Sequence, residues 1–170
     1  MNIQPRLEDD RFLIRALNED DRNQLFLVAS DPLIWDQHPA KERATRAGFD
    51  QFFDQSLTSG GALVIIDKKL DKIIGSSRYE LHKEDSKAVQ IGWTYLSREY
   101  WGNGTNDKIK EMMIAHAFHY MDRVLLYIDH KNYRSQGAAK KIGAQQVSMQ
   151  DYPVVYRDRP DYTTFVLEKD

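Results

Sequence analysis

The segment Ala88–Gly143 constrains the fold more than any other part of the chain, because its pattern switches between strand and helix over short distances. Side chains of two kinds alternate along Ala88–Leu96, as they do in a strand whose two faces differ. Two glycines follow, and then apolar residues recur at helical spacing to about Tyr120. Val124–Ile128 is short and rich in strand-forming residues, which indicates a buried central strand. Asn132–Ile142 is predicted to form a short helix that the next residue, a glycine, ends.

The remaining segments predict two early helices, a hairpin and two late strands. Apolar positions close to helical spacing follow Asn18 and Thr45, whose side chains are typical helix N-caps. Asp31-Pro32 ends the first of these helices, since the residue before a proline avoids helical geometry. The polar stretch Asp67–Lys72 separates two apolar runs and is typical of a hairpin with a longer loop. The predicted strands outside the central segment are Phe12–Arg15, Ala62–Ile66, Ile73–Tyr79, Gln145–Met149 and Tyr162–Leu167.

The order of these elements indicates the fold class. Strands of antiparallel type are joined to a strand–helix–strand–helix section, so the chain is predicted to be an α+β (mixed α/β) domain. Its 170 residues suit one core, because ordinary domains span about 100–150 residues and two smaller domains would each be marginal. We therefore expect a single domain over residues 1–170.

Composition excludes several classes of protein. The chain has 24 basic and 26 acidic residues, and its formal net charge of −2 argues against a general nucleic-acid binder. The absence of cysteine rules out disulfides, a thiol nucleophile and cysteine-based zinc or iron–sulfur sites. The longest apolar run, Ala62–Ile66, is far shorter than the ~20 residues of a membrane span, and the N-terminal residues lack the pattern of a secretion signal. We expect a cytoplasmic protein with no nucleic-acid or membrane partner.

The turn Trp101–Gly104 joins the strand Ala88–Leu96 to the long helix. Gly102 and Gly104 permit positive φ or a close backbone approach, and the first amides of the helix lack partners within it. Such amides, together with the helix dipole, favour phosphate, although glycines before a helix also simply make turns. Two nucleotide signatures fit poorly. Asp107 stands where the dinucleotide fingerprint needs its third glycine, and the phosphate-loop ending is absent.

Three motifs, in order, relate the chain to a known superfamily. Ile91–Trp93 is an isoleucine-glycine-aromatic strand, Tyr100–Gly104 is an aromatic and glycine turn, and Asn132–Ser135 begins a helix that ends at Lys141–Gly143. Over about Val89–Ala144 these motifs resemble the GNAT superfamily of N-acetyltransferases, specifically its ribosomal-protein N-terminal (alanine) acetyltransferase branch. The resemblance implies a splayed mixed sheet flanked by about four helices. It also implies an enzyme that transfers an acetyl group from acetyl-CoA directly to a primary amine.

The resemblance further implies roles for individual residues. Acetyl-CoA is expected between the strands Ala88–Leu96 and Val124–Ile128, with backbone donors at the developing oxyanion. Ser135 is expected near the sulfur, as the proton donor to the leaving thiolate. The residues expected to bind the cofactor are Trp93, Thr94 and Tyr95 along the pantetheine, Trp101, Gly102, Asn103, Gly104, Thr105 and Asn106 around the pyrophosphate, and Asn132 at the cofactor arm.

Several positions depart from the family pattern. Gln90 stands where a glutamate is frequent, and Ala139 stands where many relatives carry a tyrosine acid, so Ser135 is the only acid that the motifs supply. Glu99 and Asp107 place carboxylates near the expected phosphate site. These departures keep a second hypothesis open, in which the chain is a catalytically weak acyl-CoA-binding sensor or interaction module of the same fold.

The general base has to come from outside the motifs. Glu80, just after the predicted strand Ile73–Tyr79, is the first choice, with His82 beside it, because a base must reach the amine directly or through water. His38, in the loop Leu33–Arg43, is a further candidate. Each of these residues has an ordinary alternative as a solvated loop side chain.

Other features leave alternatives open. His116 and His119 lie three residues apart on one helix, but no H-E-x-x-H pattern is present, so we expect no metal site. The acceptor, a protein N-terminus or a small-molecule amine, stays open because the segments that shape it, Leu33–Arg43 and Gln150–Asp161, have the least pattern. The oligomeric state stays open too, a homodimer included. The basic residues expected either at the ribose 3′-phosphate of CoA or on a solvated helix face are Lys131, Arg134, Lys140 and Lys141.

Overall fold

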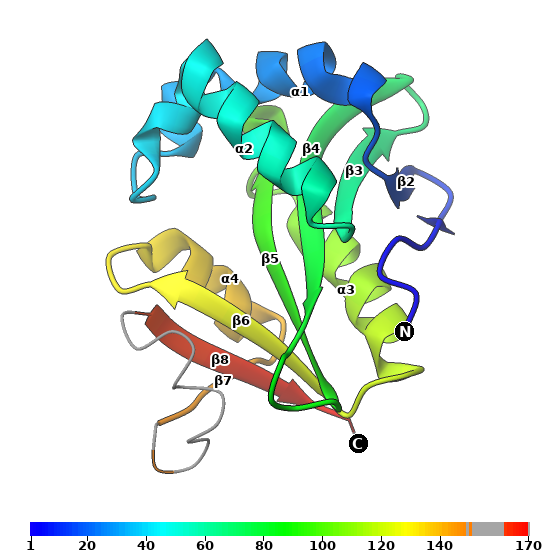
Figure 1. Ribbon diagram of the computed structural model, residues 1–170, viewed down its shortest axis with the longest axis vertical. Helices are drawn as coiled ribbons and strands as arrows, with labels where there is room; N and C mark the ends of the chain where they lie inside the picture. Colours follow the sequence, from blue (N-terminus) through cyan, green and yellow to red (C-terminus); the bar gives the residue numbers. More distant parts are fainter. Residues whose placement is uncertain (149, 151–161, 170) are drawn as a thin grey trace.

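A computed structural model describes residues 1–148, 150 and 162–169. Over these residues, eight strands form one sheet in the order β1-β2-β3-β4-β5-β6-β8-β7 (Figure 1). None of the helices in this part of the chain is long and apolar enough to cross a membrane. The strands are β1 Leu7–Glu8, β2 Phe12–Ala16, β3 Ala62–Asp67, β4 Lys72–Leu81, β5 Ala88–Leu96, β6 Arg123–Asp129, β7 Gln145–Gln146 and β8 Tyr162–Glu168. The helices are α1 Arg22–Ala29, α2 Arg46–Thr58, α3 Thr105–Phe118 and α4 Tyr133–Lys141, with 3₁₀ turns η1 Glu19–Asp21, η2 Pro32–Ile34, η3 Lys41–Ala44 and η4 Arg98–Tyr100.

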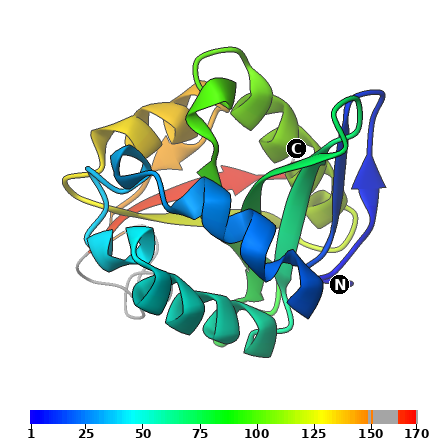
Figure 2. The same cartoon turned by 90° about the horizontal axis from the view of Figure 1, so that it is seen from above.

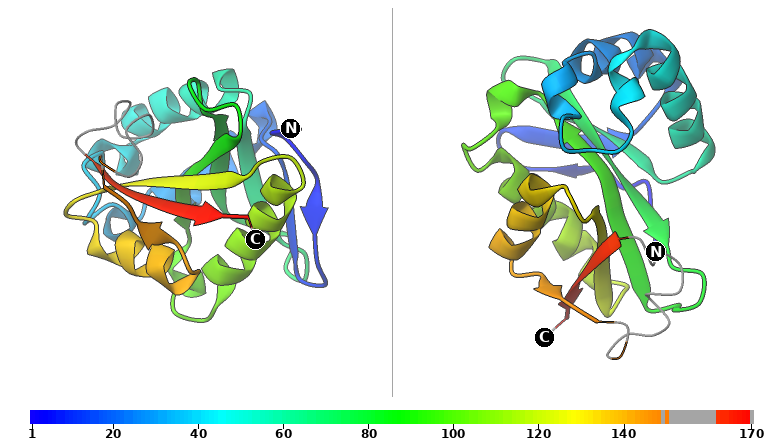
Figure 3. Two further views of the ribbon diagram at one scale, coloured as in Figure 1. Left: turned by 90° about the horizontal axis from the view of Figure 1, so that it is seen from below. Right: turned by 90° about the vertical axis from the view of Figure 1, so that its left-hand side faces the viewer.

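β5 and β6 are parallel neighbours that pair over a short distance. Ala88–Gln90 of β5 lie opposite Arg123–Leu125 of β6, and beyond these residues the two strands separate (Figure 1). β6 instead continues in antiparallel register with β8 along all 7 of its residues, and the two strands run side by side in Figure 3. The sheet therefore opens as a V between β5 and β6.

A β-bulge interrupts the ladder between β4 and β5 beside this opening. The register shifts between Ser76 and Arg78, so that Trp93 and Thr94 of β5 together face the single residue Ser77. Trp93 has a φ of 52°, a left-handed conformation that is uncommon for a bulky residue. The backbone of β5 is thus irregular at the residues where the V begins to widen.

Different helices cover the two faces of the sheet. Ile109, Met113 and Ala117 of α3 are buried against the strands on one face. Leu25 of α1 and Phe49 of α2 are buried on the opposite face, and Figure 2 shows α2 and α3 on opposite sides of the strands. Burial on both faces explains why β3 is apolar along nearly its whole length.

Side-chain caps start helices at the residues that the sequence predicts. Thr45 Oγ1 accepts a hydrogen bond from the Gly48 N–H at 3.2 Å, and Asn132 Oδ1 accepts one from the Ser135 N–H at 3.1 Å. Asn18 also caps its segment, but the first turn after it is the 3₁₀ turn η1, and α1 begins only after that turn.

The expected fold class is confirmed, with four helices around a splayed mixed sheet in the described ranges of the chain. The differences are local. β1 was not predicted, because two residues paired with Leu13 and Ile14 of β2 are too few to show a period. The predicted loop Leu33–Arg43 contains residues of two 3₁₀ turns. Met149, the predicted end of the strand that begins at Gln145, lies outside the described residues.

A substitution at Gly75 of β4 can test how closely β4 and β5 approach each other beside the V. A Cβ atom at this position would overlap the backbone carbonyl oxygen of Tyr95 and crowd Leu96. We expect Gly75→Ala to lower the free energy of unfolding by about 1–3 kcal/mol, the usual cost of overpacking, as measured by urea denaturation. Gly137→Ala, in open space within α4, should instead raise it by about 0.5–1 kcal/mol. Unchanged stability in Gly75→Ala would contradict the close approach.

Candidate functional site

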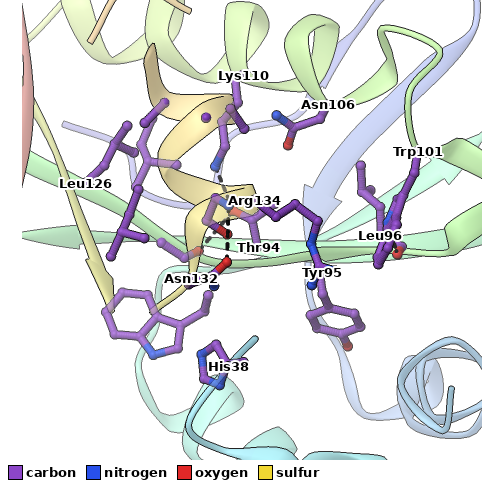
Figure 4. Close-up of a pocket in the computed structure, with 18 of the residues that line it drawn as sticks. His38, Thr94, Tyr95, Leu96, Trp101, Asn106, Lys110, Leu126, Asn132 and Arg134 are labelled. Atoms are coloured by element: carbon purple, nitrogen blue, oxygen red, sulfur yellow. Dashed lines mark hydrogen bonds between the residues drawn. The ribbon is translucent and has the colours of Figure 1, made fainter. Parts of the chain in front are cut away.

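A cavity of about 400 Å³ lies in the V between β5 and β6. Its walls come from β5, β6, the first two turns of α3, the length of α4, and the segment between α1 and α2, with Tyr100 of η4 and Tyr162 of β8 (Figure 4). The predicted site residues that line it are Trp93, Thr94, Tyr95, Trp101, Gly102, Gly104, Asn106, Asn132 and Ser135. Asn103, Thr105 and Glu80 do not line it. Most of the predicted site residues therefore come together around one space. Of the predicted acceptor segment Gln150–Asp161, only residue 150 is among the described residues.

The edge of β5 that faces the cavity carries backbone groups without a strand partner. Beyond Gln90, no strand in the described part of the chain pairs with this edge. An unpaired edge offers a row of N–H and C=O groups to an extended molecule lying beside it. Trp93, Thr94 and Tyr95 belong to this stretch, so the edge can hold a linear ligand through its main chain.

α3 begins at the cavity wall with a glycine. Gly104, the N-cap, has a φ of 83° and Gly102 a φ of 70°, conformations that side chains other than glycine rarely adopt. A Cβ atom at either position would meet nothing within 4 Å, so open space lies beside the turn. Asn103 Oδ1 accepts a hydrogen bond from the Thr105 N–H at 3.1 Å and fixes this turn. Free amides at a helix start with open space beside them suit a phosphate.

The two carboxylates that the sequence places near this turn are both paired with lysines. Asp107 Oδ2 lies 2.5 Å from Lys141 Nζ on α4. Glu99 Oε2 lies 3.2 Å from Lys72 Nζ, and Glu99 does not line the cavity. Because each negative charge has a positive partner, neither carboxylate strongly opposes an anion at the start of α3.

Asn132 and Ser135 lie at the start of α4, also at the cavity wall. Asn132 is 7% exposed, and its Oδ1 is occupied by the backbone N–H of Ser135. The side-chain NH₂ of Asn132 and the hydroxyl of Ser135 make no hydrogen bond with any described residue. Both groups are therefore available to a ligand in the cavity.

Arg134 joins α4 to the segment between α1 and α2. Its Nη2 donates to the carbonyl oxygen of Ile34 at 2.7 Å, and its Nη1 donates to Asp36 Oδ1 at 3.1 Å. Its guanidinium lies 4.2 Å from the centroid of the Trp101 ring. Of the four basic residues considered for a phosphate, Arg134 and Lys141 are thus engaged with protein groups, and Arg134 closes one side of the cavity.

His38 lies at the end of the cavity formed by the segment between α1 and α2. Burial, and then the charge of Arg43, lowers the pKa of His38 to about 4. Its Nδ1 accepts a hydrogen bond from the Ala40 N–H at 2.9 Å, so the neutral ring carries its proton on Nε2. A ring in this form donates a hydrogen bond from Nε2, and the geometry does not favour His38 as the base.

Arg43, which was not predicted, lines the same end. Its guanidinium lies 4.0 Å from the centroid of the Phe52 ring and 5.6 Å from that of Trp35. It makes no hydrogen bond or ion pair with a described side chain, and burial lowers its pKa. Nothing in the local sequence marks this arginine, because its position depends on how the loop folds against α2.

Glu80 stands outside the cavity but is connected to its wall. Its Oε2 lies 3.4 Å from Arg78 Nη2, and the Arg78 guanidinium lies 3.3 Å from the centroid of the Trp93 ring. His82, the neighbouring candidate, accepts hydrogen bonds at Nδ1 from two backbone N–H groups of the β4–β5 loop, at 3.3 and 3.0 Å. That contact gives His82 a structural role, while Glu80 as the base stays a prediction.

Lys110 of α3 is the second cavity residue that was not predicted. Its side chain is buried, and its Nζ donates to Thr94 Oγ1 at 2.6 Å (Figure 4). The spacing of Lys110, Met113 and Ala117 was the available signal, since residues at i, i+3 and i+7 share one helix face. Lysine is almost never buried unless it is paired, so the burial of Lys110 requires an explanation.

A split sheet with an unpaired strand edge, next to a glycine-capped helix start, is suited to an extended, phosphate-bearing ligand. A family model described as the acetyltransferase (GNAT) domain matches residues 11–145. The match covers most of the chain, which therefore belongs to the GNAT acetyltransferase domain family.

Solved structures have the same fold at low sequence identity. A GCN5-related N-acetyltransferase from Brucella melitensis has a TM-score of 0.80 at 20% identity, covering 97% of this chain and 79% of that one. A candidate ribosomal-protein-serine acetyltransferase from Vibrio cholerae has 0.74 at 14%, covering 99% and 100%. The microcin C7 self-immunity acetyltransferase MccE, in complex with acetyl-CoA and AMP, has 0.71 at 15%, covering 95% and 94%. Comparison with curated proteins finds no match.

No cluster of three or more His, Asp or Glu side chains suited to a metal ion occurs among the described residues. His116 Nε2 lies 2.8 Å from the carbonyl oxygen of Asn2, and His119 Nδ1 lies 2.7 Å from that of Ala115. These two histidines therefore contact different backbone groups.

The buried position of His38 has a measurable consequence. The folded chain keeps this ring neutral down to about pH 4, whereas an unfolded chain protonates it near its ordinary pKa of 6.5. The contribution of His38 to stability is therefore complete above pH 6.5 and is lost as the pH falls toward 4. We expect the His38 ring resonances to titrate near pH 4 by NMR in the folded protein, with His38→Gln used for assignment. Titration near pH 6.5 would contradict the buried, neutral ring.

Proposed function

We propose that the protein transfers an acetyl group from acetyl-CoA to a primary amine, by direct transfer between two bound substrates. The observation that carries this proposal is the cavity in the V, where the unpaired edge of β5, the glycine-capped start of α3 and Ser135 of α4 meet. Membership of the GNAT family supports acetyl transfer, and MccE, which has this fold, was solved with acetyl-CoA. We further propose that residues 1–170 form one GNAT domain.

The groups around the cavity fit the parts of acetyl-CoA. The edge of β5 at Trp93–Tyr95 offers main-chain groups to the amides of the pantetheine. The amides from Gly102 to Asn106 suit the diphosphate. Asn103 contributes through its main chain only, because its Oδ1 accepts the hydrogen bond of the Thr105 N–H, and that amide of Thr105 is therefore partly engaged within the turn. The free NH₂ of Asn132 suits an oxygen of the cofactor arm. When bound, acetyl-CoA supplies the acetyl group activated as a thioester.

The residues of this chain have two proton transfers to perform. The amine must be neutral to attack the thioester carbon, and we assign removal of its proton to Glu80 through water, since Glu80 is linked to the cavity wall by Arg78. As the C–N bond forms and the C–S bond breaks, the Ser135 hydroxyl donates a proton to the leaving sulfur. The chain contains no cysteine, so no acetyl-cysteine forms on the way.

Two acceptors and one alternative function are consistent with this site. The structural likeness to a candidate ribosomal-protein-serine acetyltransferase supports a protein N-terminus as the acceptor, and a small-molecule amine is the other choice. The alternative function is an acyl-CoA-binding sensor or interaction module. It is favoured by Gln90 and Ala139, because both are buried and neither supplies the acid or base that relatives place there.

Replacement of the proposed acid separates these functions. With a panel of amines and peptide N-termini, we expect Ser135→Ala to lower kcat for thiol release by about 10²-fold or more, the usual contribution of a general acid. The affinity for acetyl-CoA should not change, because the Ser135 hydroxyl is not among the groups proposed to hold the cofactor. Ser30→Ala, which alters a serine outside the cavity, is the control.

Binding is measured alongside turnover. Acetyl-CoA at 100 times its Kd should raise the free energy of unfolding by roughly 2.7 kcal/mol. This stabilisation without turnover on any acceptor would favour the sensor. No stabilisation at any concentration would contradict both functions.

A further inference from the structure

Lys110 is a buried ammonium group aimed at the cavity. The residue is 7% exposed and lines the cavity from the second turn of α3. Its Nζ donates to Thr94 Oγ1 at 2.6 Å (Figure 4). That oxygen lies 2.8 Å from Ser77 Oγ. An ammonium group has three N–H donors, so one neutral hydroxyl leaves most of its hydrogen-bonding capacity unused.

No negative charge balances this lysine within the described part of the chain, where no carboxylate lies within ion-pairing distance of it. The carboxylates of the cavity have other partners: Asp107 pairs with Lys141, and Asp129 accepts the backbone N–H of Lys131 at 2.8 Å. The titratable groups that line the cavity with Lys110 are His38 and Arg43 of the segment between α1 and α2, Tyr95 of β5, Tyr100 of η4, Asp107 of α3, Tyr127 and Asp129 of β6, Arg134 and Lys141 of α4, and Tyr162 of β8.

An unpaired buried charge is costly, so the group gives up its proton readily. Burial lowers the pKa of Lys110 to about 7, from an ordinary value of 10.5. Above pH 7 the lysine is thus mostly neutral in the folded protein, whereas it stays protonated in an unfolded chain. This difference makes the folded protein without ligand more stable as the pH rises from 7 toward 10.

The position of the side chain suggests which group balances its charge. Side chains on a helix lean toward its N-terminus, and the ammonium group of Lys110 lies beside Thr94 in the same cavity that Gly102 and Gly104 line, where amides at the helix start suit phosphate. A phosphate oxygen in that space brings the negative charge that the protein does not provide, and it restores the ammonium form.

We propose that Lys110 takes up a proton when acetyl-CoA binds, and that its ammonium group pairs with the diphosphate of the cofactor. This inference rests on the proposed function, because it needs acetyl-CoA in the V. The step is a protonation only: the neutral amine gains one proton from solvent, and no covalent bond to the ligand forms. Lys110 is accordingly a cofactor-binding residue whose charge depends on the ligand.

The experiment is isothermal titration calorimetry of the full chain with acetyl-CoA at pH 8, in buffers of different ionisation enthalpy. We expect uptake of about one proton per acetyl-CoA bound, because the lysine is neutral before binding and charged after it. Between pH 7.5 and 9 the Kd should rise roughly tenfold per pH unit. The wild-type measurement needs no variant, so it is unaffected by any folding defect.

Two lysines of one helix provide the matched pair of variants. Lys110→Met should abolish proton uptake and raise Kd by about tenfold at pH 7.5, the equivalent of one charge-assisted hydrogen bond. It should not lower the free energy of unfolding of the ligand-free protein, which separates loss of binding from loss of structure. Lys108→Met, at an exposed lysine paired with Glu111, should bind and take up protons as the wild type does.

A ligand without phosphate identifies the group that Lys110 meets. S-acetylpantetheine keeps the thioester and the amides, so its binding should take up no proton. Proton uptake with this fragment would overturn the assignment to the diphosphate. Tight, pH-independent binding of acetyl-CoA to both wild type and Lys110→Met would overturn the inference and leave the proposed function intact. Failure of the wild type to bind acetyl-CoA at any pH would overturn the two together.

Discussion

The site depends on the end of the hydrogen-bond ladder between β5 and β6. The two strands pair over three residues and then separate, because β6 continues with β8 while β5 continues with β4. Buried backbone groups need hydrogen-bond partners, so the groups on a strand edge that faces a cavity must bond to a ligand or to water. The bulge at Trp93 and the left-handed φ of that residue lie at this same point. Loss of the separation would remove the cavity, whatever side chains remained.

Charge is arranged around the opening to suit an anion, although the whole chain is slightly acidic. Near the start of α3, Asp107 and Glu99 are each paired with a lysine. Two basic side chains on the cavity wall, Lys110 and Arg43, have no acidic partner among the described residues. The near-neutral total charge therefore says little about the ligand, because a small number of unpaired groups sets the local potential. Lys110 lies on the α3 side of the cavity and Arg43 at the opposite end, in the segment that is expected to shape the acceptor site.

Periodic features of the chain were predictable from the sequence, and features that depend on distant contacts were not. The strand Ala88–Leu96 and the helix capped by Thr45 follow from alternation, helical spacing and a capping side chain. The α3 end of the cavity was also predictable, because two glycines directly before a helical pattern mark the start of that helix. The departure of β6 toward β8 involves residues far apart in sequence, so no local pattern reveals it.

Side chains of the site follow the same division. Asn132 and Ser135 were found because they belong to a motif at a helix start. Lys110 was missed because only its burial in the folded chain makes it unusual, and its helical position merely places it beside Met113. Arg43 was missed because a 3₁₀ turn carries it onto Phe52, and no spacing rule covers such a turn.

The proposed function requires that the edge of β5 beyond Gln90 and the start of α3 together hold acetyl-CoA. Amide hydrogen exchange, followed residue by residue with and without acetyl-CoA, is the decisive measurement, because main-chain N–H groups are the proposed contacts. We expect slower exchange at Trp93–Tyr95 and Gly104–Asn106 when the ligand is bound, with little change in β3, which is already paired on both sides. Unchanged exchange along β5 at saturating acetyl-CoA, or protection confined to a surface away from the V, would contradict this expectation.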